Sequence, residues 1–161
     1  MKRVFSIVLV LLLLCGCSGE GIEVEPLTTD ISFLCEATYY NEEYKCECTV
    51  LKNGDATINF TYPENVNGLT FKFTKNSVSA NFNGVEYLND KIVFENSVAQ
   101  LIYDVLTNAD GKVYEKGDVF YTEGVAGDYE YRLQLGATGL PIMITTRPDV
   151  AQVMFKKVKI K

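Results

Sequence analysis

The sequence predicts an α+β domain that is mostly antiparallel β-sheet, with a single helix. Apolar and polar residues alternate with a period of two in several segments between residues 31 and 82, which is typical of strands that bury one face. Apolar residues spaced three and four apart over residues 97–109 predict one amphipathic helix. Alternation returns after residue 112, so more strands follow the helix.

The first 29 residues differ in character from the rest. Lys2 and Arg3 precede an apolar run over residues 4–14, and small residues follow it, as in an export signal. The stretch Leu14-Cys15-Gly16-Cys17 resembles a bacterial lipobox. The resemblance implies removal of residues 1–16 and a diacylglycerol on the thiol of Cys17. Residues 17–29 would then be the lipidated N-terminus and a flexible linker, and residues 30–161 the folded domain.

A plain secretory signal and a transmembrane anchor are the other interpretations of this segment. The apolar run is about half of the ~20 residues that cross a bilayer, which argues against a retained span. A diacylglycerol carries two acyl chains, and two chains hold a protein stably on a membrane. We therefore expect an exported, extracytoplasmic domain that is anchored to the bacterial cell membrane through the lipid on Cys17.

Residues 31–39 and 44–50 predict the first hairpin. Their apolar sets share one face if Tyr40 pairs with Glu43 across a turn at Asn41-Glu42, whereas a one-residue slip would expose one whole set. This register places three pairs directly opposite each other: Tyr39 and Tyr44, Cys35 and Cys48, Glu36 and Glu47.

Three further strands, at residues 56–62, 69–73 and 78–82, extend this hairpin into a meander. Between residues 44–50 and 56–62, a two-residue Asn53-Gly54 turn would put the apolar residues of these two strands on different faces. A three-residue loop, Lys52-Asn53-Gly54, keeps them together and puts Gly54 in the left-handed region. The segment from Val85 onward continues or bends the fifth strand.

The helix at residues 97–109 has Asn96 or Ser97 as its candidate N-cap and Gly111 as its candidate stop. After it, strands are expected within residues 112–122, 129–135, 142–144 and 150–160, with Gly117 in a turn or bulge. The apolar stripe of the helix is expected to cover the meander, and it contains Val98, Leu101, Ile102, Val105 and Leu106.

Four segments carry a resemblance to a known family: Tyr62-Pro63, Gly68-Leu69-Thr70-Phe71, Gly127-Asp128-Tyr129-Glu130-Tyr131 and Gly139-Leu140-Pro141. With the helix and the lipobox, they make residues 30–160 similar to the half-open barrel lipoproteins of the LolA and LppX type, above all to clostridial germination-type lipoproteins. The resemblance implies a strongly curved half-barrel sheet around the single helix and a cavity for lipid, lipoprotein cargo or a partner. It does not imply catalysis. Residues 18–29 depart from the family, because they are too short and turn-rich for its usual first helix.

The helix is expected to lie against the concave face without filling it. A helix of about 13 residues is only ~20 Å long, which leaves part of a curved sheet uncovered. An open apolar surface usually marks a ligand or partner site. Tyrosines on an inner face suit a cavity rim or a wet groove, although ordinary packing at sheet edges explains any single tyrosine somewhat better. The predicted cavity lining comprises Phe33, Tyr39, Tyr44, Phe60, Tyr62, Phe71, Phe73, Phe82, Leu101, Val105, Tyr129 and Tyr131.

Three cysteines, Cys35, Cys46 and Cys48, fall on the predicted inner face. A Cys35–Cys48 disulfide is one interpretation, because export favours oxidation, and buried free thiols are the other. A zinc site is disfavoured, because closed zinc sites have four ligands. Glu36 and Glu47 suggest a carboxylate pair for catalysis or cation binding, but solvated side chains are the simpler interpretation.

The composition excludes several functions. The net charge is −6 for the whole chain and becomes −8 without Lys2 and Arg3, and an acidic chain without a basic stripe argues against nucleic-acid binding. The chain has no histidine, the commonest general base and metal ligand, so we expect neither an enzyme nor a metal or cofactor.

The predicted function is that of a membrane-tethered lipoprotein that binds a lipid or acyl chain. The alternative is an envelope lipoprotein that docks a partner protein and has a packed interior.

Overall fold

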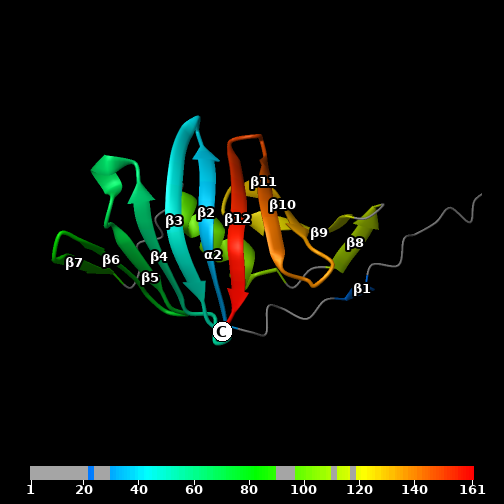
Figure 1. Ribbon diagram of the computed structural model, residues 1–161, viewed down its shortest axis with the longest axis horizontal. Helices are drawn as coiled ribbons and strands as arrows, with labels where there is room; N and C mark the ends of the chain where they lie inside the picture. The colour runs from blue at the N-terminus through cyan, green and yellow to red at the C-terminus, as the bar shows by residue number, and fades with distance from the viewer. Residues whose placement is uncertain (1–21, 24–29, 90–96, 110–111, 117–118) are drawn as a thin grey trace, which may run out of the picture.

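The structure is a computed structural model that describes residues 22–23, 30–89, 97–109, 112–116 and 119–161 (Figure 1). The signal at residues 1–16, Cys17, Asn96, Gly111 and Gly117 lie outside the described residues, as does most of the linker. The described strands form one twelve-stranded sheet in the order β1-β8-β9-β10-β11-β12-β2-β3-β4-β5-β6-β7, with antiparallel neighbours throughout. No helix in the described part is long and apolar enough to span a membrane.

The sheet consists of two meanders joined side by side. The first contains β2 (Ile31–Tyr39), β3 (Glu42–Val50), β4 (Ala56–Tyr62), β5 (Thr70–Phe73), β6 (Val78–Phe82) and β7 (Val85–Asn89), with a short 3-10 helix η1 (Glu64–Val66) after β4. The second contains β8 (Lys112–Lys116), β9 (Val119–Ala126), β10 (Tyr129–Leu135), β11 (Pro141–Arg147) and β12 (Ala151–Ile160), and β1 (Ile22–Glu23) pairs with β8. The predicted five-strand meander is therefore confirmed, and β7 extends it.

The last strand joins the two meanders in the middle of the sheet. β12 pairs with β2, so that Val153 lies opposite Ala37 and Phe155 opposite Cys35. The rings of Phe33 and Phe155 meet edge to face, with centroids 5.0 Å apart. Because β7 and β1 are not paired with each other in the described sheet, the sheet is unclosed.

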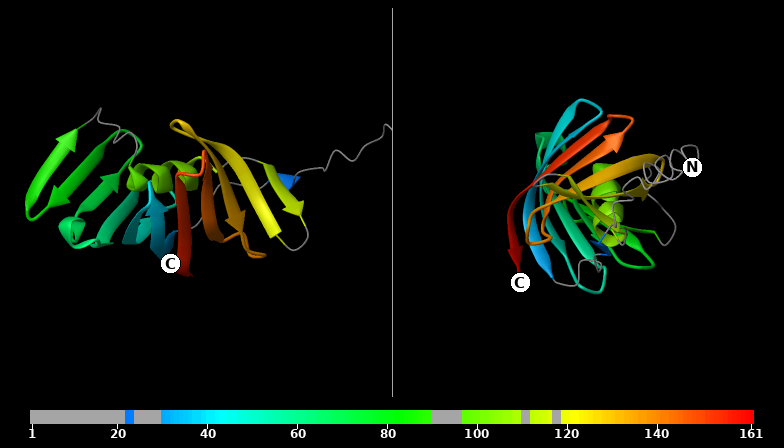
Figure 2. Two further views of the ribbon diagram at one scale, coloured as in Figure 1. Left: turned by 90° about the horizontal axis from the view of Figure 1, so that it is seen from above. Right: turned by 90° about the vertical axis from the view of Figure 1, so that its right-hand side faces the viewer.

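The helix α2 (Val98–Thr107) lies against one face of the sheet, which bends around it (Figure 2). We call this face the inner face. Ser97 is the N-cap, since its hydroxyl accepts a hydrogen bond of 3.0 Å from the backbone N–H of Gln100. All five residues of the predicted stripe are buried, which confirms the amphipathic pattern.

The predicted register of the first hairpin is wrong by two residues. Tyr40 and Asn41 form the turn, with φ of 49° and 67°, as in a type I′ turn that matches the twist of the strands. Tyr39 therefore pairs with Glu42 and Cys35 with Cys46. Because the side-chain period of a strand is two, this shift leaves every residue on its predicted face.

The loop between β3 and β4 has the predicted three residues. Leu51 N–H donates to the carbonyl of Asp55, and Gly54 has a φ of 87°. The β4 strand departs from the prediction at its end: the register shifts between Phe60 and Tyr62, so that Tyr62 pairs with Lys45, an outer-face residue. The predicted inner position of Tyr62 is therefore wrong, and its ring lies under the Lys45 ammonium, 5.9 Å from the centroid.

Candidate apolar binding site

Most of the predicted cavity residues pack against one another instead of lining a cavity. A side chain that lines an open cavity keeps part of its surface accessible, but each of these residues is at most 8% exposed. In the described part of the structure, the helix therefore leaves no open space between itself and these side chains, contrary to the expectation. The nine buried residues are Phe33, Tyr39, Phe60, Phe71, Phe73, Leu101, Val105, Tyr129 and Tyr131.

A row of aromatic rings fills the space between the helix and the sheet. The ring centroids of Phe60 and Phe71 are 6.0 Å apart, and those of Phe71 and Phe73 are 6.1 Å apart. Tyr103 of α2 stacks on Phe73 at 4.5 Å with an interplanar angle of 12°. The sequence pattern does not predict Tyr103 as a residue of the inner side, because it lies beside the aliphatic stripe of the helix. From this position its ring covers the ring of Phe73.

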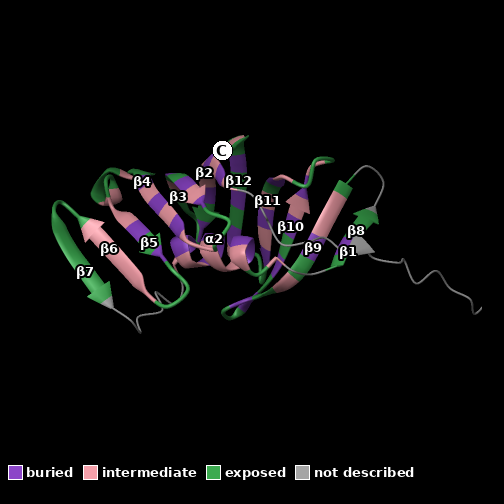
Figure 3. Ribbon diagram, turned by 90° about the horizontal axis from the view of Figure 1, so that it is seen from below, coloured by how far each residue is buried: buried purple, intermediate pink, exposed green. Residues whose placement is uncertain are grey.

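The inner face becomes exposed beyond this row, on the β6–β7 hairpin. Phe82 is 37% exposed, Val85 73% and Tyr87 49%. Val85 lies opposite Phe82, and Tyr87 lies opposite Ala80, which in turn lies opposite the buried Phe71. We call Phe82, Val85 and Tyr87 the hairpin surface. Burial decreases from β5 through β6 to β7 (Figure 3).

Only one member of the hairpin surface was predicted as a site residue, Phe82. Val85 and Tyr87 were missed, although their alternation continues the inner face after the Asn83-Gly84 turn. Both turn residues have positive φ, 52° and 82°, so the chain reverses and returns the next apolar residues to the same face. Of the other predicted lining residues, Tyr44 is half-buried and Tyr62 is on the outer face.

The inner tyrosines near the strand turns satisfy one another's hydroxyl groups. The hydroxyl of Tyr129 lies 3.4 Å from that of Tyr39 and 2.8 Å from that of Tyr40. Burial raises the pKa of Tyr129 and of Tyr39 above the ordinary value. This group joins the β2–β3 turn to the β9–β10 turn, so its role is packing and not the wet cavity rim considered from the sequence.

A hollow of about 630 Å³ lies over β9, β10 and β11. Its lining includes Glu123, Arg132, Arg147 and Asp149, and Tyr131 is its one predicted site residue. Arg132 donates two hydrogen bonds to Glu123, of 2.8 and 2.6 Å, and lies over the ring of Tyr121. A lining of charged side chains does not suit an apolar ligand.

The three inner cysteines come together as predicted, but in a different arrangement. Cys46, and not Cys48, lies directly opposite Cys35, because of the shifted register. Because Cys35 and Cys48 are not directly opposite each other, the geometric basis of the predicted Cys35–Cys48 bridge is wrong. All three cysteines are free thiols in this structure. Hydrogen bonds with Cys35 and Cys48 lower the pKa of Cys46 to about 5, and burial raises the pKa of Cys35.

The same shift removes the expected carboxylate pair. Glu36 lies opposite Lys45, and Glu47 lies opposite Leu34. Lys156 of β12 donates a hydrogen bond to Glu36 and thereby lowers the pKa of this carboxyl group. Glu36 is thus a solvated member of an ion pair, as in the simpler interpretation.

No protein-family model and no curated protein matches the chain. Solved structures resemble its fold. An uncharacterized conserved protein from Thermus thermophilus has a TM-score of 0.57 and 11% identity, over 84% of this chain and 80% of that one. The similar structures also include a LolA superfamily protein from Nitrosomonas europaea, with a TM-score of 0.47 and 8% identity over 86% and 89% of the two chains. A putative outer membrane lipoprotein-sorting protein domain from Vibrio parahaemolyticus has a TM-score of 0.45 and 10% identity over 85% and 87%.

The solved structures found similar to the chain thus include a protein of the LolA superfamily, the family that the sequence resembles. The likeness concerns the fold alone, because the identity is 11% or less in each of these three structures.

Proposed function

We propose that the chain is a membrane-tethered lipoprotein of the half-barrel type that binds a lipid or an acyl chain on the inner face of its sheet. The hairpin surface supports this proposal. It continues the packed inner face outward without a polar break, from Phe71 at 6% exposure through Ala80 to Tyr87 at 49%. An apolar ligand on this surface would therefore rest on two aromatic rings and meet the edge of the core.

The exposed apolar area of the hairpin surface is large enough to contribute measurably to the free energy of ligand binding. Phe82 and Tyr87 are 37% and 49% exposed, and an aromatic side chain can bury about 200 Å², so together they offer about 170 Å². At about 25 cal/mol per Å², covering this area contributes up to about 4 kcal/mol before the entropy of association is subtracted. This free energy is enough for reversible binding of an acyl chain that also contacts Val85.

The lipid anchor on Cys17 fits the same function. Because Ile22 and Glu23 pair with β8, residues 18–21 would join the anchor to the domain, and four extended residues reach at most about 14 Å. The tether would therefore hold the β1 edge of the sheet close to a membrane, which is itself a source of acyl chains, while the hairpin surface lies at the opposite edge of the sheet. A binding role, as opposed to catalysis, is in line with the complete lack of histidine.

The test uses two neighbouring residues of β7 that point to opposite faces. Tyr87→Lys puts a charge on the hairpin surface, whereas Leu88→Lys puts the same charge on the outer face at a residue that is 70% exposed. Binding of a fluorescent fatty acid should weaken about tenfold or more for Tyr87→Lys, because about half of one ring is lost from the contact. It should stay unchanged for Leu88→Lys.

A protein-docking module is the second candidate, and the closed interior favours it. In the described sheet β7 is an edge strand with apolar side chains on both faces, and such an edge can pair with another chain. If the wild-type protein takes up no apolar probe, lipid binding is rejected. Docking through the edge then predicts that Leu88→Lys weakens partner binding as much as Tyr87→Lys does.

A further inference from the structure

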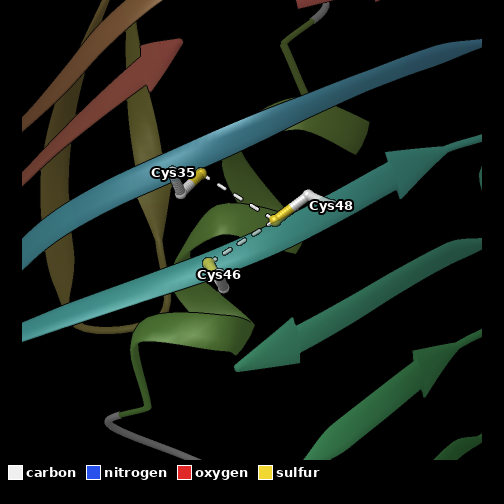
Figure 4. A group of neighbouring side chains, drawn as sticks. All are labelled: Cys35, Cys46 and Cys48. Atoms are coloured by element: carbon white, nitrogen blue, oxygen red, sulfur yellow. Dashed lines mark hydrogen bonds between the residues drawn. The ribbon is translucent and has the colours of Figure 1, made fainter. Parts of the chain in front are cut away.

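Three sulfur atoms meet in the interior of the first hairpin (Figure 4). The Sγ atoms of Cys46 and Cys48 are 3.6 Å apart, and those of Cys48 and Cys35 are 3.8 Å apart. All three lie within 4.8 Å of one another, and the side chains are 1–3% exposed. The cluster forms because Cys46 and Cys48 share the inner face of β3 and Cys35 faces Cys46 from β2.

We propose that these three thiols form a trigonal binding site for monovalent copper, Cu(I). Thiolate is the soft ligand that Cu(I) prefers among protein side chains. With metal–sulfur bonds of about 2.3 Å, as for zinc thiolates, three sulfurs around an ion in their plane are about 4.0 Å apart. Two of the observed separations are 3.6 and 3.8 Å, and the third, between Cys35 and Cys46, is at most 4.8 Å, so each side differs from this triangle by less than about 1 Å.

The donor set favours Cu(I) over zinc. Structural zinc sites are tetrahedral and have four protein ligands. In the described part of the chain, no fourth cysteine, aspartate or glutamate joins this cluster, and the sequence contains no histidine. An ion that is satisfied by three sulfurs is therefore the better match.

The surroundings would also protect an oxidation-sensitive ion from solvent. Phe33 and Ile58 lie opposite Cys48 on the two neighbouring strands, and Phe60 lies opposite Cys46, so the site is apolar and closed to water. The three Cu–S bonds form as the three thiols release three protons to solvent, so the site changes from neutral to a net charge of −2. Copper enters and stays as Cu(I), so no electron is transferred. Because the site is enclosed, we expect the ion to exchange slowly.

The experiment measures Cu(I) binding to the full-length chain in detergent under anaerobic conditions. Cys15→Ser and Cys17→Ser remove the two other thiols, so that only the three inner cysteines remain. Cu(I) is offered as the complex of a coloured Cu(I) chelator, both to the folded protein and during refolding. We expect one equivalent to bind in at least one of these modes, with a thiolate-to-copper absorption band and three sulfur neighbours in X-ray absorption.

Two variants separate ligation from packing. Cys46→Ser should weaken Cu(I) binding at least about 100-fold, since loss of an outer-shell partner alone costs about 10–100-fold at metal sites. Ile58→Val trims the buried neighbour opposite Cys48 without removing a sulfur and should keep the full equivalent. Circular dichroism checks that each variant is folded, and a Cys48→Ser variant replaces Cys46→Ser if the latter does not fold.

Three results would overturn the proposal. The first is a wild-type protein that takes up no more Cu(I) than the variant without the three cysteines, which would make them apolar core residues. The second is a disulfide between any two of them in anaerobically purified protein, as counted by intact mass after alkylation. The third is displacement of the copper by excess Zn(II), because that would contradict a preference for three ligands.

Discussion

Gly124 of β9 lies directly opposite Tyr131 of β10, and the tyrosine ring covers it. A Cβ atom added at Gly124 would lie 2.6 Å from the Tyr131 hydroxyl oxygen, 2.7 Å from Cζ and 2.9 Å from Cε1. Cβ contacts this short do not occur in real proteins, so Gly124→Ala must displace the ring. Tyr131 is only 5% exposed, and its ring would have to move against buried neighbours.

Overpacking of this kind costs about 1–3 kcal/mol, and the lower entropy of alanine in the unfolded chain returns about 0.4–1 kcal/mol. The difference between these ranges is about 0–2.6 kcal/mol with a central value of about 1.3 kcal/mol, so we expect Gly124→Ala to lower the free energy of unfolding by about 1–2 kcal/mol. For a domain of this size each kcal/mol changes Tm by about 2–4 °C, so the melting temperature should fall by about 2–8 °C. Urea titration and thermal melting followed by circular dichroism measure both quantities.

Gly136 provides the matched control. Its added Cβ would meet its nearest neighbours at 3.6 to 3.9 Å, which is ordinary contact, and its φ is not in the left-handed region. Gly136→Ala should therefore be neutral or stabilising by up to about 1 kcal/mol. In a Tyr131→Leu background the penalty of Gly124→Ala should disappear. A Gly124→Ala protein as stable as the wild type would refute the reasoning.

Two other predictions concern the tether and the helix. Cys17→Ala should leave the precursor unprocessed by the lipoprotein route and without label from a fatty-acid probe, and unchanged labelling would contradict lipidation of this residue. Ser97→Ala removes the hydroxyl that accepts from the Gln100 N–H and should destabilise the domain by about 1 kcal/mol in urea titration. Ser97→Asp keeps an acceptor and should restore the stability, so an equal loss in both variants would speak against the cap.

The closed interior changes where an apolar ligand would bind. The length of the helix relative to the width of the sheet predicted an open space beneath the helix. The inner side chains of the central strands are instead buried, and the open apolar surface lies at one end of the sheet, on the β6–β7 hairpin. The helix does leave part of the apolar inner face of the sheet uncovered. Which part stays uncovered depends on which strand lies at the edge of the sheet, and here it is β7.

The alternation of residue types determined which side chains face inward. Phe33, Phe71 and Val105 are buried as their spacing predicts, and a register error of two residues changed none of the inner positions. This robustness has a physical reason. Side chains return to the same face every two residues in a strand and about every 3.6 residues in a helix, so a short stretch of sequence is enough to predict which face is buried. The helix α2, its N-cap and the left-handed Gly54 follow from equally local rules.

Which surfaces meet was decided only by the tertiary structure. The turn dihedrals of Tyr40 and Asn41 set the register that puts Cys35 beside Cys46, and the pairing of β12 with β2 places the end of the chain at the centre of the sheet. The shift in β4 that turns Tyr62 outward is likewise invisible in the residue pattern. The alternation of apolar and polar residues predicts which face of a strand is buried. The strand or helix that covers this face comes from a distant part of the chain, so the contact depends on the whole fold.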